Sequence, residues 1–148
     1  MKILVINGPN LNTLGSRSIA IYGDCTLQKI EDMMREWGKR FEVEVITFQS
    51  NSEGALIDFI QTNSLQADGI IINLGALTHY SFAIRDALFD VGLPIIEVHL
   101  SNIYAREDWR SKSVIAPIVK GQITGLGWRG YLAALQVLAM ELKGRAWE

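Results

Sequence analysis

The sequence predicts an α/β fold in which a five-stranded parallel sheet carries helices on both faces. Short runs of β-branched residues alternate along the chain with longer amphipathic segments. Strands that alternate with helices form parallel sheets with right-handed crossovers, and largely apolar runs are typical of strands buried on both faces. The 148 residues are enough for one good core, so we expect a single domain over residues 1–148.

The first half of the chain contains two strands and two helices. Lys2–Asn7 (KILVIN) is predicted to be the first strand and Val43–Gln49 the second. Ser52 is a suitable N-cap for a helix that runs to Asn63. The segment between the strands begins at Thr26, another suitable N-cap. Its apolar side chains recur at helical spacing, at Ile30, Met33, Met34, Trp37 and Phe41.

The second half repeats the alternation. Gly69–Asn73 (GIIIN) and Pro94–His99 (PIIEVH) are predicted to be the third and fourth strands, with a helix over about Thr78–Val91 between them. A fifth strand is expected somewhere within Ser113–Thr124, and a last helix over about Gly130–Lys143.

Five strands in a chain of this length favour a flavodoxin-like, doubly wound sheet with the strand order 2-1-3-4-5. In such sheets, ligands bind outside the carboxyl ends of the strands, where the strand order reverses. The side chains that follow the strands are therefore the first candidates for a functional site.

Composition narrows the classes of partner. A net charge of -2 gives no reason to expect nucleic acid or an anionic membrane surface. No apolar run approaches the ~20 residues that span a bilayer, and the first ten residues lack the pattern of a signal peptide. Cys25 is the only cysteine, and no cysteine or histidine spacing suggests a zinc site. A cytoplasmic protein without a metal is expected.

Polar side chains follow three of the predicted strands. Asn7 ends the first strand and Asn10 follows it, Asn73 ends the third strand and His99 ends the fourth. The only other histidine, His79, lies shortly after Asn73. A few polar groups that converge on one rim are what a small-molecule site needs, although a histidine at a strand end or helix start has structural explanations too.

Two further features stand out. Glu97 lies inside an apolar strand, where an unpaired carboxylate is costly, and His99 shares its strand face. The loop GSRSIAIYGD over 15–24 has no clear helical or strand period, yet it carries Arg17 and Tyr22. Taken alone, Asp86, Arg106 and Arg110 fit a solvated surface better than a ligand contact.

The sequence lacks the residues that several common binding motifs and catalytic mechanisms require. The segment GPNLNTLG is neither a phosphate-binding loop nor a dinucleotide fingerprint, and no G-x-S-x-G elbow is present. No lysine follows a confidently predicted strand, so a Schiff-base mechanism has no obvious nucleophile. Acid–base chemistry by histidine, tyrosine, arginine, asparagine and a buried glutamate remains.

Six motifs occur in a fixed order: NGPNLNTLG, R-x-x-x-x-Y-G, FQSNSEG, N-x-G-A-x-T-H-x-S-x-A-x-R-D-A, IEVHLSN and AREDWR. With these motifs the chain closely resembles the type II 3-dehydroquinate dehydratases, over nearly its whole length. It departs from the family pattern at Ser18, Ile19 and Ala20, which replace a Glu-Pro-acidic run, at Tyr104, where histidine is common, and at Ser52, which is often histidine.

The resemblance implies a lyase that removes water from 3-dehydroquinate through an enolate, by anti elimination and without a cofactor, to give 3-dehydroshikimate. This step serves the shikimate pathway or quinate breakdown. By resemblance, Tyr22 takes the C2 proton, His99 protonates the departing C1 hydroxyl and Glu97 orients His99. Arg17 arrives with a lid formed by residues 15–25, and Asn10 holds the enolate oxygen through water. The expected substrate contacts are Asn73, His79, Asp86, Arg110 and the backbone of Leu100 and Ser101.

A phenol is a weak base at neutral pH because it titrates near about pH 10 in water. Arg17, supported by Arg106, would stabilise the phenolate once the lid excludes water. A mobile lid would therefore bring the base and its activator to the substrate together.

The family also implies a homododecamer, a tetramer of trimers in which Asp86 reaches a neighbour's active site. We expect Ile95, Leu100 and Ile103 to leave apolar surface near the rim for such contacts. Two alternatives stay open: another cofactor-free lyase or isomerase that acts on a polyhydroxylated acid, and a non-catalytic receiver domain. Asn7 and Asn73 stand where a receiver needs acidic residues, which speaks against the second.

Overall fold

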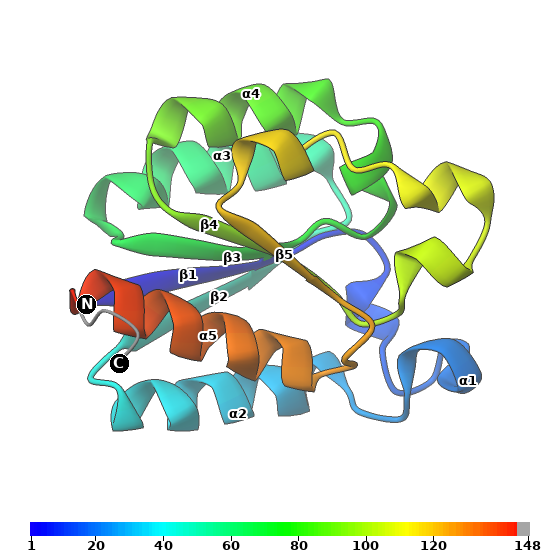
Figure 1. The fold of residues 1–148 in the computed structure, drawn as a ribbon, viewed down its shortest axis with the longest axis horizontal. Coiled ribbons are helices and arrows are strands. Elements are labelled where there is room, and N and C mark those ends of the chain that lie inside the picture. Colours follow the sequence, from blue (N-terminus) through cyan, green and yellow to red (C-terminus); the bar gives the residue numbers. More distant parts are fainter. Residues whose placement is uncertain (145–148) are drawn as a thin grey trace.

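A computed structural model describes residues 1–144 and contains one five-stranded parallel sheet with the strand order β2-β1-β3-β4-β5 (Figure 1). The predicted order 2-1-3-4-5 is confirmed. The strands are β1 (Lys2–Asn7), β2 (Glu44–Gln49), β3 (Gly69–Asn73), β4 (Ile95–His99) and β5 (Gly121–Thr124).

Helices cover both faces of the sheet, as predicted. Helices α2 (Leu27–Arg40) and α5 (Arg129–Leu142) lie together on one face, and α3 (Glu53–Asn63) and α4 (Phe82–Val91) lie on the other (Figure 1). The short helix α1 (Ile19–Tyr22) stands apart, beyond the carboxyl end of the sheet. Single 3₁₀ turns lie at Leu11–Thr13, Ser64–Gln66, Gly75–His79, Ile103–Ala105, Asp108–Ser111 and Ala116–Ile118.

The sheet divides the core into two clusters. Ile3 and Val5 of β1 point to the side of α2 and α5, whereas Leu4 and Ile6 point to the side of α3 and α4. Because both faces of β1 are covered, its side chains are apolar on both faces rather than alternating. This burial explains why the apolar runs located the central strands from sequence alone.

One predicted helix begins later than expected. The pattern placed its start near Thr78, but α4 begins at Phe82, after a 3₁₀ turn over Gly75–His79. Ser81 is the N-cap, and its side chain accepts a hydrogen bond of 3.1 Å from the amide of Ile84. The Thr78 hydroxyl instead donates a hydrogen bond to the buried carboxylate of Glu97, so Thr78 does not cap the helix.

The prediction of apolar surface near the rim is also wrong. Ile95, Leu100 and Ile103 are 2%, 4% and 3% exposed, because they are part of the core or are covered by the turns that follow β4. Large apolar side chains that do reach the surface include Phe82 and Phe89 of α4, which are 63% and 70% exposed. Within residues 1–144, no helix is long and apolar enough to cross a membrane.

Gly8 allows the ends of β1 and β3 to meet. Its amide donates to the carbonyl of Asn73 at 2.7 Å, and a Cβ at this position would lie 2.5 Å from the carbonyl oxygen of Leu74. Both neighbours are backbone, so neither can move without a shift of the strand ends. Only glycine fits at this point of closest approach.

We therefore expect Gly8→Ala to lower the free energy of unfolding by about 1–3 kcal/mol, because the added methyl group overlaps backbone atoms. Gly54→Ala is the matched control, since a Cβ there meets only the Ser52 hydroxyl, at 3.9 Å, and alanine favours the helix. Urea unfolding of both variants measures the difference. Equal stability of the two variants would contradict this account.

Candidate active site

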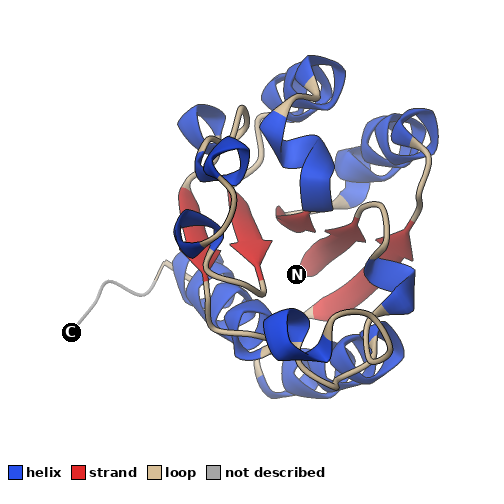
Figure 2. Cartoon of the chain, turned by 90° about the vertical axis from the view of Figure 1, so that its right-hand side faces the viewer, coloured by secondary structure: helices blue, strands red, loops and turns tan. Residues whose placement is uncertain are grey.

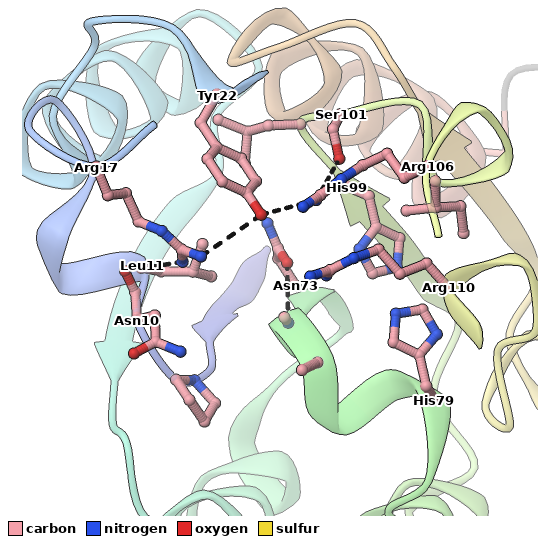
Figure 3. A pocket seen from close by; sticks show the side chains of 15 residues that line it. Asn10, Leu11, Arg17, Tyr22, Asn73, His79, His99, Ser101, Arg106 and Arg110 are labelled. Carbon is pink, nitrogen blue, oxygen red and sulfur yellow. Dashed lines mark hydrogen bonds between the residues drawn. The ribbon is translucent and has the colours of Figure 1, made fainter. Parts of the chain in front are cut away.

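A pocket opens at the carboxyl ends of β1, β3 and β4, the end of the sheet that faces the viewer in Figure 2. It lies at the reversal of strand order, where the fold predicts a ligand site. Ten of the sequence-predicted site residues line it: Asn10, Arg17, Tyr22, Asn73, His79, His99, Leu100, Ser101, Arg106 and Arg110 (Figure 3). The sequence prediction did not include Pro9, Leu11, Gly75, Ala76 and Ile103, which complete the lining.

The predicted pairing of Glu97 with His99 is confirmed. The Nε2 atom of His99 lies 2.7 Å from Oε1 of Glu97, and the two residues are 5% and 0% exposed. Nε2 faces a carboxylate oxygen, so it must carry the proton, and Nδ1 is left for other partners. The hydrogen bond to Glu97 thus fixes the position and the tautomer of the His99 imidazole.

Sequence reasoning required a partner for Glu97 but missed three of the four donors around it. The Thr78 hydroxyl donates to Oε1, the Ser113 hydroxyl lies 2.9 Å from each carboxylate oxygen, and Gln122 Nε2 donates to Oε2 at 3.0 Å. These donors come from a 3₁₀ turn, a loop and β5, so only the folded chain brings them together.

The donors decide the charge of this carboxyl group. Burial works to raise the pKa of Glu97, but the hydrogen bond and charge of His99, with the hydroxyls of Thr78 and Ser113, outweigh it and hold the pKa below the ordinary value of 4.5. Glu97 is therefore an ionised carboxylate at neutral pH and a strong acceptor for the His99 ring.

His79 lies beside His99 in the pocket, with ring centroids 6.4 Å apart, and is positioned by its own neighbours (Figure 3). Its Nδ1 lies 2.7 Å from the carbonyl oxygen of Lys112, which can only accept, so Nδ1 donates. Its ring packs edge-on against Trp109, with centroids 5.2 Å apart. Burial lowers the pKa of His79, as do His99 and Arg110 nearby, so the neutral ring offers Nε2 as an acceptor at neutral pH.

Two guanidinium groups meet the hydroxyl of Tyr22. Nη1 of Arg106 donates to it at 2.7 Å, and Nη2 of Arg17 lies 3.5 Å away (Figure 3). Both groups also face the ring, at 4.5 Å for Arg17 and 5.2 Å for Arg106. The sequence assigned the larger part to Arg17, but here Arg106 makes the shorter hydrogen bond. Tyr22, the residue that the family resemblance assigns as the base, thus has two arginines at its hydroxyl.

The segment that carries Arg17 and Tyr22 crosses the pocket. Arg17 Nη1 donates to the carbonyl oxygen of Asn10 at 3.3 Å, which ties the segment to the loop after β1. No regular structure is predicted for this segment, yet α1 occupies Ile19–Tyr22. Its outward residues include Ile19, which is 54% exposed.

Arg110 and Asn73 reach the pocket from different elements, the 3₁₀ turn Asp108–Ser111 and the end of β3. The guanidinium of Arg110 stacks over the ring of Trp109 at 4.0 Å and donates Nε–H to Glu107. Asn73 is buried at the end of β3, where its Oδ1 accepts from the amide of Gly75 at 3.1 Å. A cation and an amide thus line the same pocket as the two histidines.

Asp86 is the one predicted substrate contact that lies outside the pocket. It is on the exposed face of α4, and among the residues that the structure describes it does not line the pocket. Phe82 and Phe89, four residues before and three after it, share this face. Across residues 1–144, no group of three histidine, cysteine, aspartate or glutamate side chains is arranged to hold a metal ion.

A doubly wound α/β fold with a cation-bound phenol and a carboxylate-bound imidazole on one pocket defines an acid–base enzyme for a small polar substrate. The chain belongs to the dehydroquinase class II family, whose model matches residues 1–139. The resemblance indicated by the six motifs is therefore confirmed.

The similarity to known relatives extends over almost the full chain. The 3-dehydroquinate dehydratase of Roseiflexus castenholzii is 59% identical over 138 residues, which are 93% of this chain and 88% of the relative. That of Bacillus subtilis is 49% identical over 143 residues, 97% of each chain. The crystal structure of type II dehydroquinase from Butyrivibrio crossotus has a TM-score of 0.91 and 51% identity, and the match covers 93% of this chain and 97% of that one.

The lowered pKa of Glu97 predicts a pH-dependent contribution to stability. A carboxyl group whose pKa is lower in the folded than in the unfolded state stabilises the fold fully above the unfolded value and loses this contribution as the pH falls through the folded value. Glu97→Gln removes the titrating group. We expect the variant to be less stable than the wild type at pH 7, with the gap narrowing as the pH falls from 5 to 3 by at most about 2 kcal/mol, the limit for a single titrating group over this range.

Urea unfolding of both proteins at pH 7, 5, 4 and 3 measures this gap. Other carboxylates titrate in both proteins, so the difference isolates Glu97. A gap that is constant or widens toward acid pH would show that Glu97 is not stabilised as an anion.

Proposed function

We propose that this chain removes water from 3-dehydroquinate by anti elimination, with Tyr22 as the base and His99 as the acid. As a member of the dehydroquinase class II family it is a hydro-lyase, and the reaction, which yields 3-dehydroshikimate, belongs to the shikimate pathway. The same step also serves quinate breakdown. The observation that carries the proposal is the placement of the Tyr22 hydroxyl and the Glu97–His99 pair on one pocket.

The first step is proton removal from C2. The Tyr22 phenolate, stabilised by Arg106 and Arg17, accepts the C2 proton, and the electron pair passes into the carbonyl group to form an enolate. Asn10 lies at the pocket edge, where its side chain holds the enolate oxygen through a water molecule. The positive charge of the two arginines favours the enolate over the neutral ketone.

In the second step the C1–O bond breaks and the enolate electrons form the new double bond. His99 gives its proton to the departing hydroxyl group, which leaves as water. Because Nε2 is bonded to Glu97, the proton that reaches the substrate comes from Nδ1. The Glu97 carboxylate accepts from Nε2 and so holds the ring in the orientation that this role requires.

The remaining polar groups hold the substrate. Arg110, the Asn73 amide and the backbone of Leu100 and Ser101 suit its carboxylate, and the neutral His79 ring suits a hydroxyl group. The reaction needs neither a metal nor an organic cofactor.

Residues 15–25 are proposed to act as a mobile lid over this single catalytic domain. Gly15 and Gly23 bracket the segment with φ values of 92° and 80°, which glycine adopts without strain. Backbone freedom at both ends suits a segment that opens to admit substrate and closes with Tyr22 against Arg106. Residues 145–148 of the proposed domain lie outside the described part.

We place the enzyme in the cytoplasm as a homododecamer built from trimers. The exposed Phe82 and Phe89 give α4 an apolar face on which Asp86 lies between them. Burial of this face against a second chain would bring Asp86 to a neighbour's pocket, as the family resemblance implies.

A spectroscopic assay tests the function directly. Addition of 3-dehydroquinate to protein that has been treated with a chelator should produce the ultraviolet absorbance of a conjugated enone. A substrate panel of related hydroxy acids separates this activity from that of another lyase. Absence of the absorbance with folded protein, or turnover that requires added metal, would overturn the proposal.

For the assembly, we expect light scattering to give a mass near twelve chains and Asp86→Ala to weaken substrate binding by about tenfold, a change typical of one lost polar contact. Asp58→Ala is the control, because Asp58 is an exposed carboxylate on α3. A fully active monomer, or equal binding by the two variants, would contradict this part of the proposal.

For the base, Tyr22→Phe removes the hydroxyl and keeps the ring, so kcat should fall by at least about 10²–10⁴-fold while a non-reactive substrate analogue still binds. Arg106→Ala and Arg17→Ala should each lower kcat at neutral pH, and Arg106→Ala should lower it more, because Arg106 makes the shorter bond to the Tyr22 hydroxyl. Each arginine change should add little to Tyr22→Phe, because the arginines act through the phenolate. Losses that multiply would mean that Tyr22 is not the base.

A further inference from the structure

Beneath the pocket, a buried tyrosine hydroxyl is bonded to a residue of the pocket wall. Tyr131 of α5 is 0% exposed, and its hydroxyl oxygen accepts from Asn73 Nδ2 at 2.9 Å. The same hydroxyl donates to Oδ1 of Asn7 at 2.6 Å. Asn7 and Asn73 lie opposite each other at the ends of β1 and β3, so the tyrosine connects the two central strands from below the site.

The direction of these bonds is fixed by the backbone. The Gly75 amide can only donate, and it lies 3.1 Å from Oδ1 of Asn73. The NH₂ group of Asn73 must therefore face Tyr131, whose oxygen accepts and whose own proton goes to Asn7. An Asn73 amide turned the other way would leave the Gly75 amide facing another donor.

Burial also keeps the hydroxyl in its neutral form. It raises the pKa of Tyr131 far above the ordinary phenol value, so the hydroxyl both donates and accepts at any working pH. Tyr131 is thus a permanent acceptor for Asn73. Its role differs from that of Tyr22, whose hydroxyl meets two cations instead of two neutral amides.

One of the two Nδ2 protons of Asn73 is used by Tyr131, and the second remains. Asn73 lines the pocket, where this second N–H is available to a substrate oxygen (Figure 3). We propose that Tyr131 is a positioning residue for substrate binding, which orients the Asn73 amide so that this N–H faces the substrate. The inference rests on the proposed role of Asn73 as a substrate contact.

The test is a double-mutant cycle in the full-length, assembled enzyme. Tyr131→Phe removes only the hydroxyl and keeps the ring in the core. The loss of one well-oriented neutral hydrogen bond corresponds to a rise in KM of about three- to tenfold. We expect kcat to change by less than about twofold, because a binding contact is equally present in the ground and transition states.

Asn73→Ala should raise KM by at least as much, and Tyr131→Phe should add nothing in the Asn73→Ala background. Asn7→Ala is the matched control: it removes the other bond of the same hydroxyl, yet the bond between Tyr131 and Asn73 stays. Its KM should therefore stay closer to the wild-type value than that of Tyr131→Phe. Circular dichroism checks that each variant is folded.

An unchanged KM for Tyr131→Phe would overturn the inference. So would an equal rise in KM with and without the Asn73 side chain, because the tyrosine would then act through the fold in general. An unchanged KM for Asn73→Ala would instead remove Asn73 from the proposed substrate contacts. The two failures are therefore distinguishable.

Discussion

The buried carboxylate of Glu97 is the constraint on which the site depends. An ionised group without solvent costs several kcal/mol unless donors surround it. Thr78, His99, Ser113 and Gln122 provide those donors, and they come from the segment after β3, from β4, from the loop that leads to β5, and from β5 itself. Satisfying one charge thus brings four segments of the chain to the same point. The same arrangement leaves the His99 imidazole with one possible orientation.

The pocket is electrostatically unlike the chain as a whole. The chain carries a net charge of -2, yet Arg17, Arg106 and Arg110 all line the pocket. Of the carboxylates beside these residues, Glu107 pairs with Arg110 and Arg106, and Glu97 accepts from His99. A positive pocket attracts a carboxylate substrate and stabilises negative charge that develops during the reaction. Because Arg17 and Tyr22 belong to the same segment, closure of the lid would complete this field only when the substrate is enclosed.

Much of this architecture could be predicted from the sequence, and the exceptions have a physical pattern. Strands such as β1 and β3 were located because burial on both faces requires an apolar run. Glu97 was recognised as a paired group because a carboxylate in such a run needs donors. The identity of most donors could not be predicted, since Ser113 and Gln122 are ordinary polar residues until the fold brings them together. The start of α4 was wrong for the same reason: the Thr78 hydroxyl serves Glu97, and Ser81 is the cap.

The central claim is that proton removal and departure of the hydroxyl group are performed by different residues on one pocket. Exchange of the C2 proton in deuterated water tests it most directly, because a base can form the enolate even when the leaving group is not protonated. We predict that folded His99→Ala incorporates deuterium at C2 of recovered substrate while it forms almost no product, and that Tyr22→Phe does neither. Exchange that is lost in His99→Ala but kept in Tyr22→Phe would contradict the account.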